Sequence, residues 1–511
     1  TFSFESSDAS FGGGIDVAWF NYPSTLSGYT LGKSTNTESI TIGGALSVKG
    51  PISIYGGDIH VSANLISGAT TGSAILLDGA YIFQDNADVS SSGGNITYKS
   101  RSLSTASRDF GIHIEGTSGN KSEIDAAGGD IVFDAAFVGT SALGGSDRVI
   151  LLEEAVISTS DSGTVTLEGD GSLSDETDTV WGLELKNTRV QTQNGKLVLD
   201  GTGGMISDNS RGIGFNNTSA SVLSETGDIQ FIDRQPSDSA GDYNFTGLYL
   251  RASSANDINI GADGINVVTS SSDISIQSDR PNFAITASNI TTSGTFALEP
   301  IATSFNDSID LSLLNIGGNP SSVTIANANN TANLTIGSAI TASGPINIYG
   351  GNLALDAALT TINDDINLYA SGAVTQSAPL TATGLALNGS GSYTLQHTSN
   401  NVGTLAGGAS DARLGAVSYF DVDDLTIGTV NPTGIYSSGD VVIETGAGNI
   451  NLSQPINTTS TTNTTTGYAG AIVLNAGKSA GFGNATGGDI IVSGGTISSG
   501  GINKLYSGSP D

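Results

Sequence analysis

Short stretches of alternating apolar and polar residues recur along the chain, each directly after a turn rich in Gly, Asn and Asp. Such residues tolerate the left-handed backbone of a tight corner, and apolar residues two positions apart share one face of a strand. The pattern therefore predicts short β-strands. We expect their first apolar residues to point inward, namely Ile59, Ile96, Ile131, Ile229, Leu353, Val441 and Ile490.

A second strand type is interleaved with the first between about residues 90 and 260. Its copies are Gly111–Glu115, Gly182–Lys186, Gly212–Phe215 and Gly247–Arg251. Ile, Leu and Phe occupy one parity, whereas His113, Glu184, Lys186 and Tyr249 occupy the other. We predict that the first parity faces a core and the second faces solvent.

The turn–strand unit returns at residues 96, 131, 165, 197, 229 and 258, with spacings of 35, 34, 32, 32 and 29. Beyond about residue 260 the spacing falls below 20, as from Leu353 to Ile366 to Leu385. Each strand is too short to hold a core alone, but stacked copies bury one continuous core. The spacing predicts an all-β parallel β-helix, a solenoid with long loops and the form of an elongated rod. A β-sandwich array would need self-contained domains of about 100 residues.

A longer repeat lies over the short one. At an offset of 294, Thr1–Glu5 matches Thr295–Glu299 and Gly50–Gly57 matches Gly344–Gly351. We therefore predict four regions. Residues 1–90 begin the first super-repeat, 91–260 form its long-loop coils, 261–294 end it, and 295–511 form a second, partial super-repeat with shorter coils. An array that starts and stops within its pattern also suggests a larger parent polypeptide.

Charge and composition exclude several classes of function. The 511 residues include 17 Lys and Arg but 49 Asp and Glu, which gives a net charge of −32. Nucleic acid and anionic membrane surfaces need a basic face, so neither is an expected partner. The absence of Cys excludes disulfides and thiolate chemistry. No apolar run reaches the roughly 18 residues of a membrane span, so we expect no membrane insertion.

The turn–strand motifs allow a family resemblance to be stated. The repeated Ile-Tyr-Gly-Gly-[Asp/Asn]-[Ile/Leu] element resembles the repeats of giant bacterial secreted proteins of the filamentous haemagglutinin type, and so do Asn401–Leu405, Leu425–Val430 and Gly439–Ile443. The resemblance implies a right-handed parallel β-helix and export through an outer-membrane secretion partner. It also implies an extracellular or cell-surface location and roles in adhesion, biofilm or surface fibres. Expected partners are glycans or proteins of another cell surface, together with lateral or end-to-end self-association.

The sequence contains no arrangement of residues that is typical of a catalytic site. His60, His113 and His397 lie far apart in the sequence, and His60 and His113 are expected to face solvent from separate strands. Gly477–Ser479 lacks the upstream Gly of a phosphate-binding loop. We therefore predict no catalytic residue and no cofactor-binding residue.

Clustered carboxylates are the remaining candidates. They comprise Asp170, Asp175, Glu176 and Asp178 on one loop, Glu153–Glu154, Asp364–Asp365, and Asp421, Asp423 and Asp424. Glycosidases need two carboxyl groups facing each other across a sugar, whereas acidic residues in loops commonly form turns and solvated surface. Ca²⁺ takes six to eight oxygen ligands. Its weak candidate ligands here are Asp170, Asp175, Asp178, Asp421, Asp423 and Asp424.

Three functions follow in order of preference. The first is a non-enzymatic extracellular rod or stalk of a large bacterial surface adhesin that mediates cell-surface or cell–cell attachment. The second is a structural subunit of an extracellular fibre or sheath. The third is a polysaccharide-degrading β-helix enzyme. The 294-residue repeat favours the first two, because duplication lengthens a rod without disturbing any site, whereas an enzyme gains little from a second partial copy.

Overall fold

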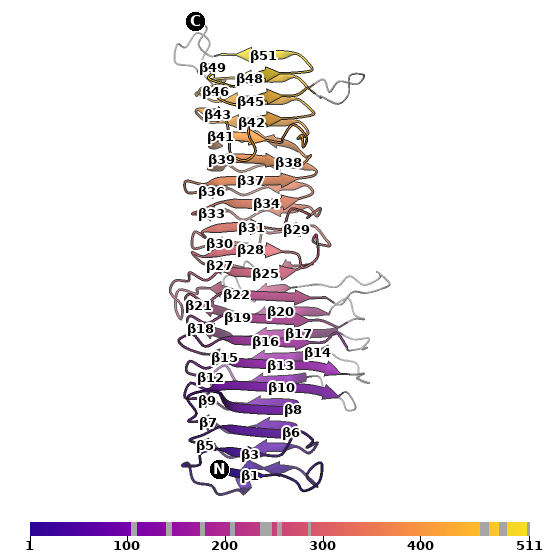
Figure 1. Ribbon diagram of the computed structural model, residues 1–511, viewed down its shortest axis with the longest axis vertical. Helices are drawn as coiled ribbons and strands as arrows, with labels where there is room; N and C mark the ends of the chain where they lie inside the picture. Colours follow the sequence, from indigo (N-terminus) through magenta and orange to yellow (C-terminus); the bar gives the residue numbers. More distant parts are fainter. Residues whose placement is uncertain are drawn as a thin grey trace. The chain divides into compact units, whose positions relative to one another are not determined.

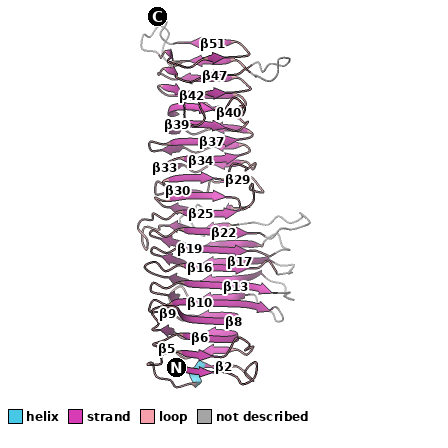
Figure 2. Ribbon diagram, viewed as in Figure 1, coloured by secondary structure: helices cyan, strands magenta, loops and turns pink. Residues whose placement is uncertain are grey.

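The computed structural model describes residues 1–103, 110–138, 146–173, 179–204, 210–235, 248–252, 258–284, 288–459, 470–479 and 488–507. The chain is all-β, with 54% of its residues in strands, and the described part contains one short 3-10 turn, η1 (Val17–Trp19) (Figure 2). Two compact units are present, Thr1–Gly294 (unit 1) and Thr295–Asp511 (unit 2). The boundary between the units falls at Thr295, where the second copy of the 294-residue repeat begins. No helix in the described ranges could cross a bilayer.

The first coils of unit 1 contain two long strands. β6 (Ile52–Val61) and β8 (Ser73–Asp85) pair in parallel over most of their length. Parallel neighbours need a crossover of the chain between them, so each pairing marks one coil stacked on the next. The shorter strands of these coils are β1 (Phe2–Phe4), β2 (Ile15–Asp16), β3 (Tyr29–Leu31), β4 (Ile40–Ile42), β5 (Leu46–Val48), β7 (Leu65–Ser67) and β9 (Val89–Ser91).

From β10 onward, three parallel ladders run through unit 1 (Figure 1). The first ladder contains β10 (Asn95–Leu103), β13 (Ile131–Val138), β16 (Val165–Asp170), β19 (Leu197–Thr202), β22 (Ile229–Arg234) and β25 (Ile274–Ser278). The second contains β11 (Phe110–Glu115), β14 (Ser146–Glu153), β17 (Thr179–Lys186), β20 (Arg211–Thr218), β23 (Tyr249–Ala252) and β26 (Asn282–Ala284). The third contains β12 (Ser122–Asp125), β15 (Ala155–Ser158), β18 (Arg189–Thr192), β21 (Ala220–Ser224), β24 (Ile258–Gly261) and β27 (Ser288–Thr291). Each ladder takes every third strand, so one coil has three strands.

Unit 2 is built in the same parallel manner. One of its sheets contains β29 (Ile309–Asp310), β32 (Leu334–Ile336), β35 (Leu353–Leu355), β38 (Ala373–Gln376), β40 (Ser392–Leu395), β42 (Val417–Asp421), β45 (Val441–Thr445), β48 (Ile472–Asn475) and β51 (Asn503–Tyr506). The other strands are β28 (Thr295–Glu299), β30 (Leu314–Gly317), β31 (Ser322–Ile325), β33 (Ile340–Ala342), β34 (Ile346–Gly350), β36 (Leu359–Thr361), β37 (Asp365–Ala370), β39 (Leu380–Asn388), β41 (Asn401–Gly407), β43 (Leu425–Ile427), β44 (Ile435–Tyr436), β46 (Ile450–Leu452), β47 (Ile456–Asn457), β49 (Ile490–Val492) and β50 (Ile497–Ser498). Many-stranded parallel sheets of this kind are consistent with a β-helix or solenoid in each unit.

The predicted coil spacing is confirmed for the first four steps of unit 1. The residues at 96, 131, 165, 197 and 229 are successive partners in the first ladder. The fifth step is wrong, because Ile229 pairs with Ile274 and that coil spans 45 residues. Ile258 pairs instead with Ala220 in the third ladder. Alternation shows which face of a strand is buried but not the ladder to which the strand belongs.

The short spacing predicted for unit 2 mixes two ladders. Ile346, Ile366 and Leu385 are successive partners, so these coils span 20 and 19 residues. Leu353 lies in the other sheet, where it pairs with Leu334 and Val374. The 13-residue step from Leu353 to Ile366 therefore joins neighbouring positions within the coil path and is not a coil length.

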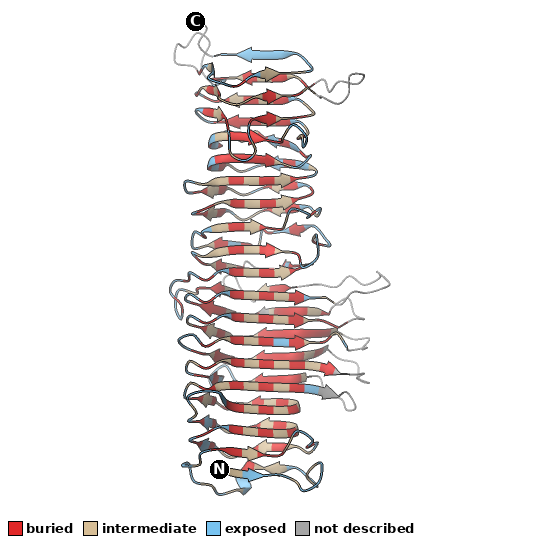
Figure 3. Cartoon of the chain, viewed as in Figure 1, coloured by how far each residue is buried: buried red, intermediate tan, exposed pale blue. Residues whose placement is uncertain are grey.

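The core follows the predicted alternation, and Figure 3 shows buried and partly exposed residues in turn along the strands. The inward residues Ile59, Ile96, Ile131, Ile229, Leu353 and Val441 are all at most 1% exposed. Ile490 is an exception, because it is only half-buried. Its strand β49 pairs with β46 on one side, and no described strand pairs with its other side.

The turn glycines lie where successive coils touch. The glycines at this turn in successive coils are Gly94, Gly129, Gly163, Gly195 and Gly227. A Cβ atom on any of the last four would overlap the carbonyl oxygen of the glycine one coil earlier. The predicted reason for glycine, a left-handed backbone, holds at Gly93 and Gly128, where φ is 118° and 105°. Close approach of backbone to backbone is thus the stronger requirement in this column of turns.

Candidate functional site

The outward face of the second ladder in unit 1 is covered rather than solvated. His113 and Tyr249 are each 9% exposed and Glu184 is fully buried, so the predicted solvent exposure is wrong for these three residues, whereas Lys186 is partly exposed. On this face, the residues that pair in register from one coil to the next are Phe83, His113, Leu151, Glu184, Gly214 and Tyr249. We call the residues Phe83, Phe110, His113, Arg148, Leu151, Trp181, Glu184, Arg211 and Tyr249 the outer strip.

One end of the outer strip is aromatic. The His113 ring lies 4.6 Å from the Phe110 ring, stacked on it, and 5.1 Å from the Phe83 ring. Burial, reinforced by the positive charges of Lys186 and Arg148, lowers the pKa of His113 from 6.5 to about 4. The imidazole is therefore neutral at pH 7. Its Nε2 atom is buried without a hydrogen-bond partner among the described residues.

The other end of the outer strip is cationic. The Arg211 guanidinium lies over the rings of Trp181 and Tyr249, at 4.5 and 3.7 Å from their centroids. A Cβ atom on Gly214 would overlap the Trp181 ring, so glycine at this position leaves room for the indole. These contacts join β17, β20 and β23, which come from three successive coils.

A buried carboxylate, Glu184, pairs with two other cations of this ladder, Arg148 and Lys186. Arg148 Nε donates to Glu184 Oε2 at 2.5 Å, and Lys186 Nζ lies 3.8 Å from the same oxygen. Glu184 is paired with two cations, which is what a buried charge requires. The outer strip therefore binds neighbouring coils to one another through aromatic, cation–π and ionic contacts.

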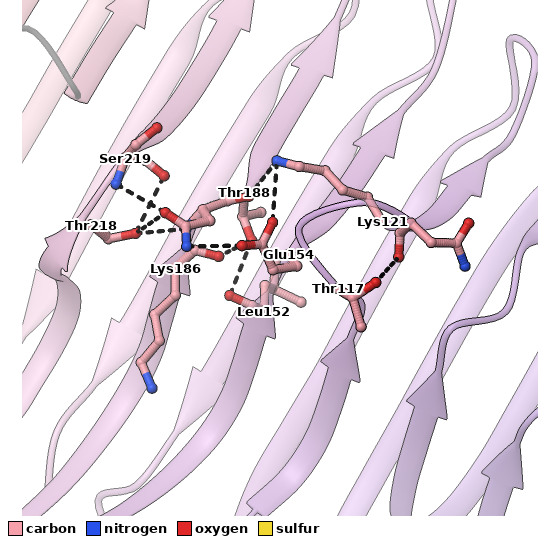
Figure 4. A network of polar contacts seen from close by, with 10 residues as sticks. Thr117, Lys121, Leu152, Glu154, Lys186, Thr188, Thr218 and Ser219 are labelled. Carbon is pink, nitrogen blue, oxygen red and sulfur yellow. Dashed lines mark hydrogen bonds and ion pairs between the residues drawn. The ribbon is translucent and has the colours of Figure 1, made fainter.

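The predicted pair Glu153–Glu154 is divided between two coil contacts. Glu153 lies 3.9 Å from Lys186 Nζ. Glu154 occupies a corner with φ of 49° and accepts a hydrogen bond from Asn187 Nδ2 at 3.0 Å. Lys121 Nζ lies 3.8 Å from Glu154 and donates to Asn187 O at 2.6 Å (Figure 4). The two carboxylates therefore bind different partners.

Asp170 lines a groove of about 370 Å³ on the outer face of the first ladder, together with Glu168, Asp200 and Arg234. Its Oδ1 accepts a hydrogen bond from Ser172 N at 2.8 Å. Burial and then the charges of Asp200 and Asp134 raise the pKa of Glu168, whereas Arg234 pairs with Asp200. The other members of this predicted cluster, Asp175, Glu176 and Asp178, lie outside the described residues.

The cluster at the end of β42 is not assembled around a common point. Asp421 is fully buried, whereas Asp423 and Asp424 are exposed. Asp421 Oδ2 accepts hydrogen bonds from Tyr419 Oη at 2.7 Å and Val402 N at 2.9 Å. Burial raises its pKa to about 7. Asp421 therefore acts as an internal hydrogen-bond acceptor.

The remaining candidates are likewise engaged locally. Asp364 Oδ1 accepts from the backbone of Asp365 at 2.8 Å, His397 Nδ1 accepts from Ser399 N at 3.2 Å, and Lys478 pairs with Glu444 at 2.7 Å. In the part of the chain that the structure describes, no three His, Asp or Glu side chains form a group that could hold a metal ion. Calcium binding stays a prediction.

No protein-family model, no curated protein and no solved structure matches this chain. The resemblance to filamentous haemagglutinin-type repeats therefore stays a prediction. The geometry described above is the basis for any proposal about function.

Proposed function

We propose that this chain is a non-enzymatic, rod-like stalk of a large bacterial surface adhesin, built as a right-handed parallel β-helix. The parallel pairing in each unit supports the β-helix, and crossovers between parallel strands are right-handed in about 98% of cases. The proposal places the chain outside the cell, exported through an outer-membrane secretion partner. Its expected contacts are glycans or proteins of another cell surface and neighbouring copies of itself.

One observation carries the non-enzymatic part of this proposal. Glu184, Glu154 and Asp421 lie in three different places and each is bonded into the coils, whereas Glu168, Asp170 and Asp200 share one groove in which Arg234 pairs with Asp200. Glu184 is paired with Arg148, Glu154 with Asn187 and Lys121, and Asp421 with the backbone N–H of Val402. Groups held in this way fasten successive coils, which suits a stalk.

Two assays on the purified chain test the proposal. In the first, the chain is incubated with a panel of acidic and neutral polysaccharides, and we expect no cleavage products. In the second, beads coated with the chain are mixed with cells, and we expect attachment above that of uncoated beads. Cleavage that is lost in Glu168→Gln and Asp200→Asn variants would overturn the proposal. Assembly of the chain into filaments without cell attachment would favour the fibre function instead.

A further inference from the structure

A charged groove of about 530 Å³ lies on unit 1 where residues 33–37 face β6, β8 and β10. Three basic side chains line it, Lys33, Lys99 and Arg101, together with the carboxylates of Asp58 and Asp78. The whole chain has 17 basic residues and a net charge of −32, so three cations in one groove are a local concentration of basic side chains, set beside two carboxylates. Its volume lies within the range of pockets that hold small organic ligands.

An asparagine side chain fastens the loop that forms one wall of this groove. Asn36 Oδ1 accepts hydrogen bonds from Ser10 Oγ at 2.8 Å and Phe11 N at 3.2 Å. Its Nδ2 donates to Tyr55 O at 3.0 Å. These bonds hold the loop against β6 through a neutral side chain.

Unit 2 contains the same fastening at the 294-residue offset. Asn330 Oδ1 accepts from Ser304 Oγ at 2.9 Å and Phe305 N at 3.2 Å, and its Nδ2 donates to Tyr349 O at 2.8 Å. The two units therefore share these three hydrogen bonds of the loop framework.

The charges of the groove are not shared. Lys33 and Asp58 correspond to Asn327 and Asn352 at the same offset. The strand register extends this comparison. In unit 1, Tyr55 pairs with Asp78, which pairs with Lys99. In unit 2, Tyr349 pairs with Tyr369, which pairs with Asn388. Asp78 and Lys99 thus correspond to Tyr369 and Asn388. Since neutral residues support the same framework in unit 2, the charges in unit 1 are not needed to form it.

The two lysines are the groups free to meet a ligand. Arg101 is engaged by Asp134 through hydrogen bonds of 2.7 and 2.6 Å. Lys33 Nζ makes one hydrogen bond, to Ser6 O at 3.0 Å, and an ammonium group has three donors. Within the described ranges Lys99 forms no hydrogen bond or ion pair through its ammonium group. Burial raises the pKa of Asp78, and the charges of Lys99 and Arg101 oppose that rise.

We propose that this groove binds a small acidic saccharide, a sugar that carries a carboxylate. The carboxylate would pair with Lys33 and Lys99, and the sugar hydroxyls would donate to Asp58 and Asp78. The two fixed carboxylates repel a densely charged polyanion, which favours a ligand whose negative charge is separated by hydroxyl groups. This inference deepens the proposed function by giving the stalk a ligand.

The test uses the full chain and isothermal titration calorimetry. The probes are galacturonic acid and trigalacturonic acid, with galactose as the neutral match. The variant K33N/K99N carries the residues of unit 2 at both positions, and K196N/K504N removes the same charge from two exposed sites. We expect both acidic probes to bind the native chain and the control variant. Their affinity for K33N/K99N should be at least about tenfold weaker, and galactose should bind none of the three.

Three results would overturn the groove proposal. The first is that the native chain and K33N/K99N bind the acidic probes with equal affinity. The second is that the native chain binds galactose as tightly as galacturonic acid. The third is that neither acidic probe binds the native chain with a Kd below about 10 mM. Circular dichroism of each variant verifies that the β-structure is retained. Attachment to cells is scored separately, so a chain that attaches without binding acidic sugars overturns the groove proposal alone.

Discussion

The most informative single substitution is Arg211→Met in the outer strip. Methionine keeps the apolar stem but removes the guanidinium that lies between the rings of Trp181 and Tyr249. A cation–π contact contributes about 0.5–1 kcal/mol when exposed and about 2 kcal/mol when desolvated, and both rings are at least nine-tenths buried. Burial also lowers the pKa of Arg211, which shows that desolvation opposes the cation. We therefore expect a net loss of about 1–3 kcal/mol from the two contacts.

The tryptophan content of the chain provides the assay. There are two tryptophans, Trp19, which is 69% exposed, and Trp181, which is 4% exposed. In a Trp19→Phe background, the fluorescence of Trp181 reports the outer strip during unfolding in urea. Arg211→Met should shift the Trp181 emission to longer wavelength and lower the midpoint of its transition, and Arg211→Lys should do so less. An unchanged emission and midpoint in Arg211→Met would refute the reasoning.

Four further predictions concern the coils. Ile131→Asp buries an unpaired charge and should cost several kcal/mol in denaturant unfolding, whereas Val132→Asp on the outer face should cost under about 1 kcal/mol; equal costs would contradict the assigned faces. Gly195→Ala should lower the melting temperature, because its Cβ would overlap the preceding turn, and an unchanged melting temperature would contradict that contact. Burial raises the pKa of Asp233 and of Asp421 from 3.8 to about 7, so both groups contribute stability below pH 4 that is lost as the pH rises through 7. The melting temperature should therefore fall more steeply between pH 4 and 7 in the native chain than in a D233N/D421N variant, and parallel curves would count against this assignment. A reductant should leave the melting temperature unchanged, since the chain has no Cys, and a lower value would contradict that expectation; a fall on adding a chelator would instead indicate bound calcium.

Local alternation in the sequence was sufficient to predict the inward residues. Ile96, Ile131 and Ile229 are buried because a period of two determines the face of a strand. It does not determine the length of the next coil, so the regular spacing predicts the wrong ladder for Ile258. The partner of Ile229 is Ile274, 45 residues later, and nothing in the intervening alternation distinguishes the two.

The sequence could not predict the outer strip or the charged groove, since both depend on coil register. Glu184 has outward parity, but it is buried against Arg148, which lies 36 residues earlier. Lys33 and Lys99 are 66 residues apart and line one groove only because the loop and the strands stack in one register. Outward parity therefore predicts solvent exposure incorrectly wherever side chains of neighbouring coils cover the residue.

The stacked-coil architecture is tested most directly by a disulfide between neighbouring coils, since the chain contains no other Cys. Thr166 and Val198 are register partners on the outer face of β16 and β19, at a spacing of about 4.8 Å that a disulfide can bridge. Oxidised T166C/V198C should form an intramolecular disulfide. T166C/Q230C places the second cysteine one coil further along the ladder, about 10 Å away and beyond disulfide reach, so it should stay reduced. Failure of the first pair to cross-link, or equal cross-linking of both pairs, would contradict the stacked coils.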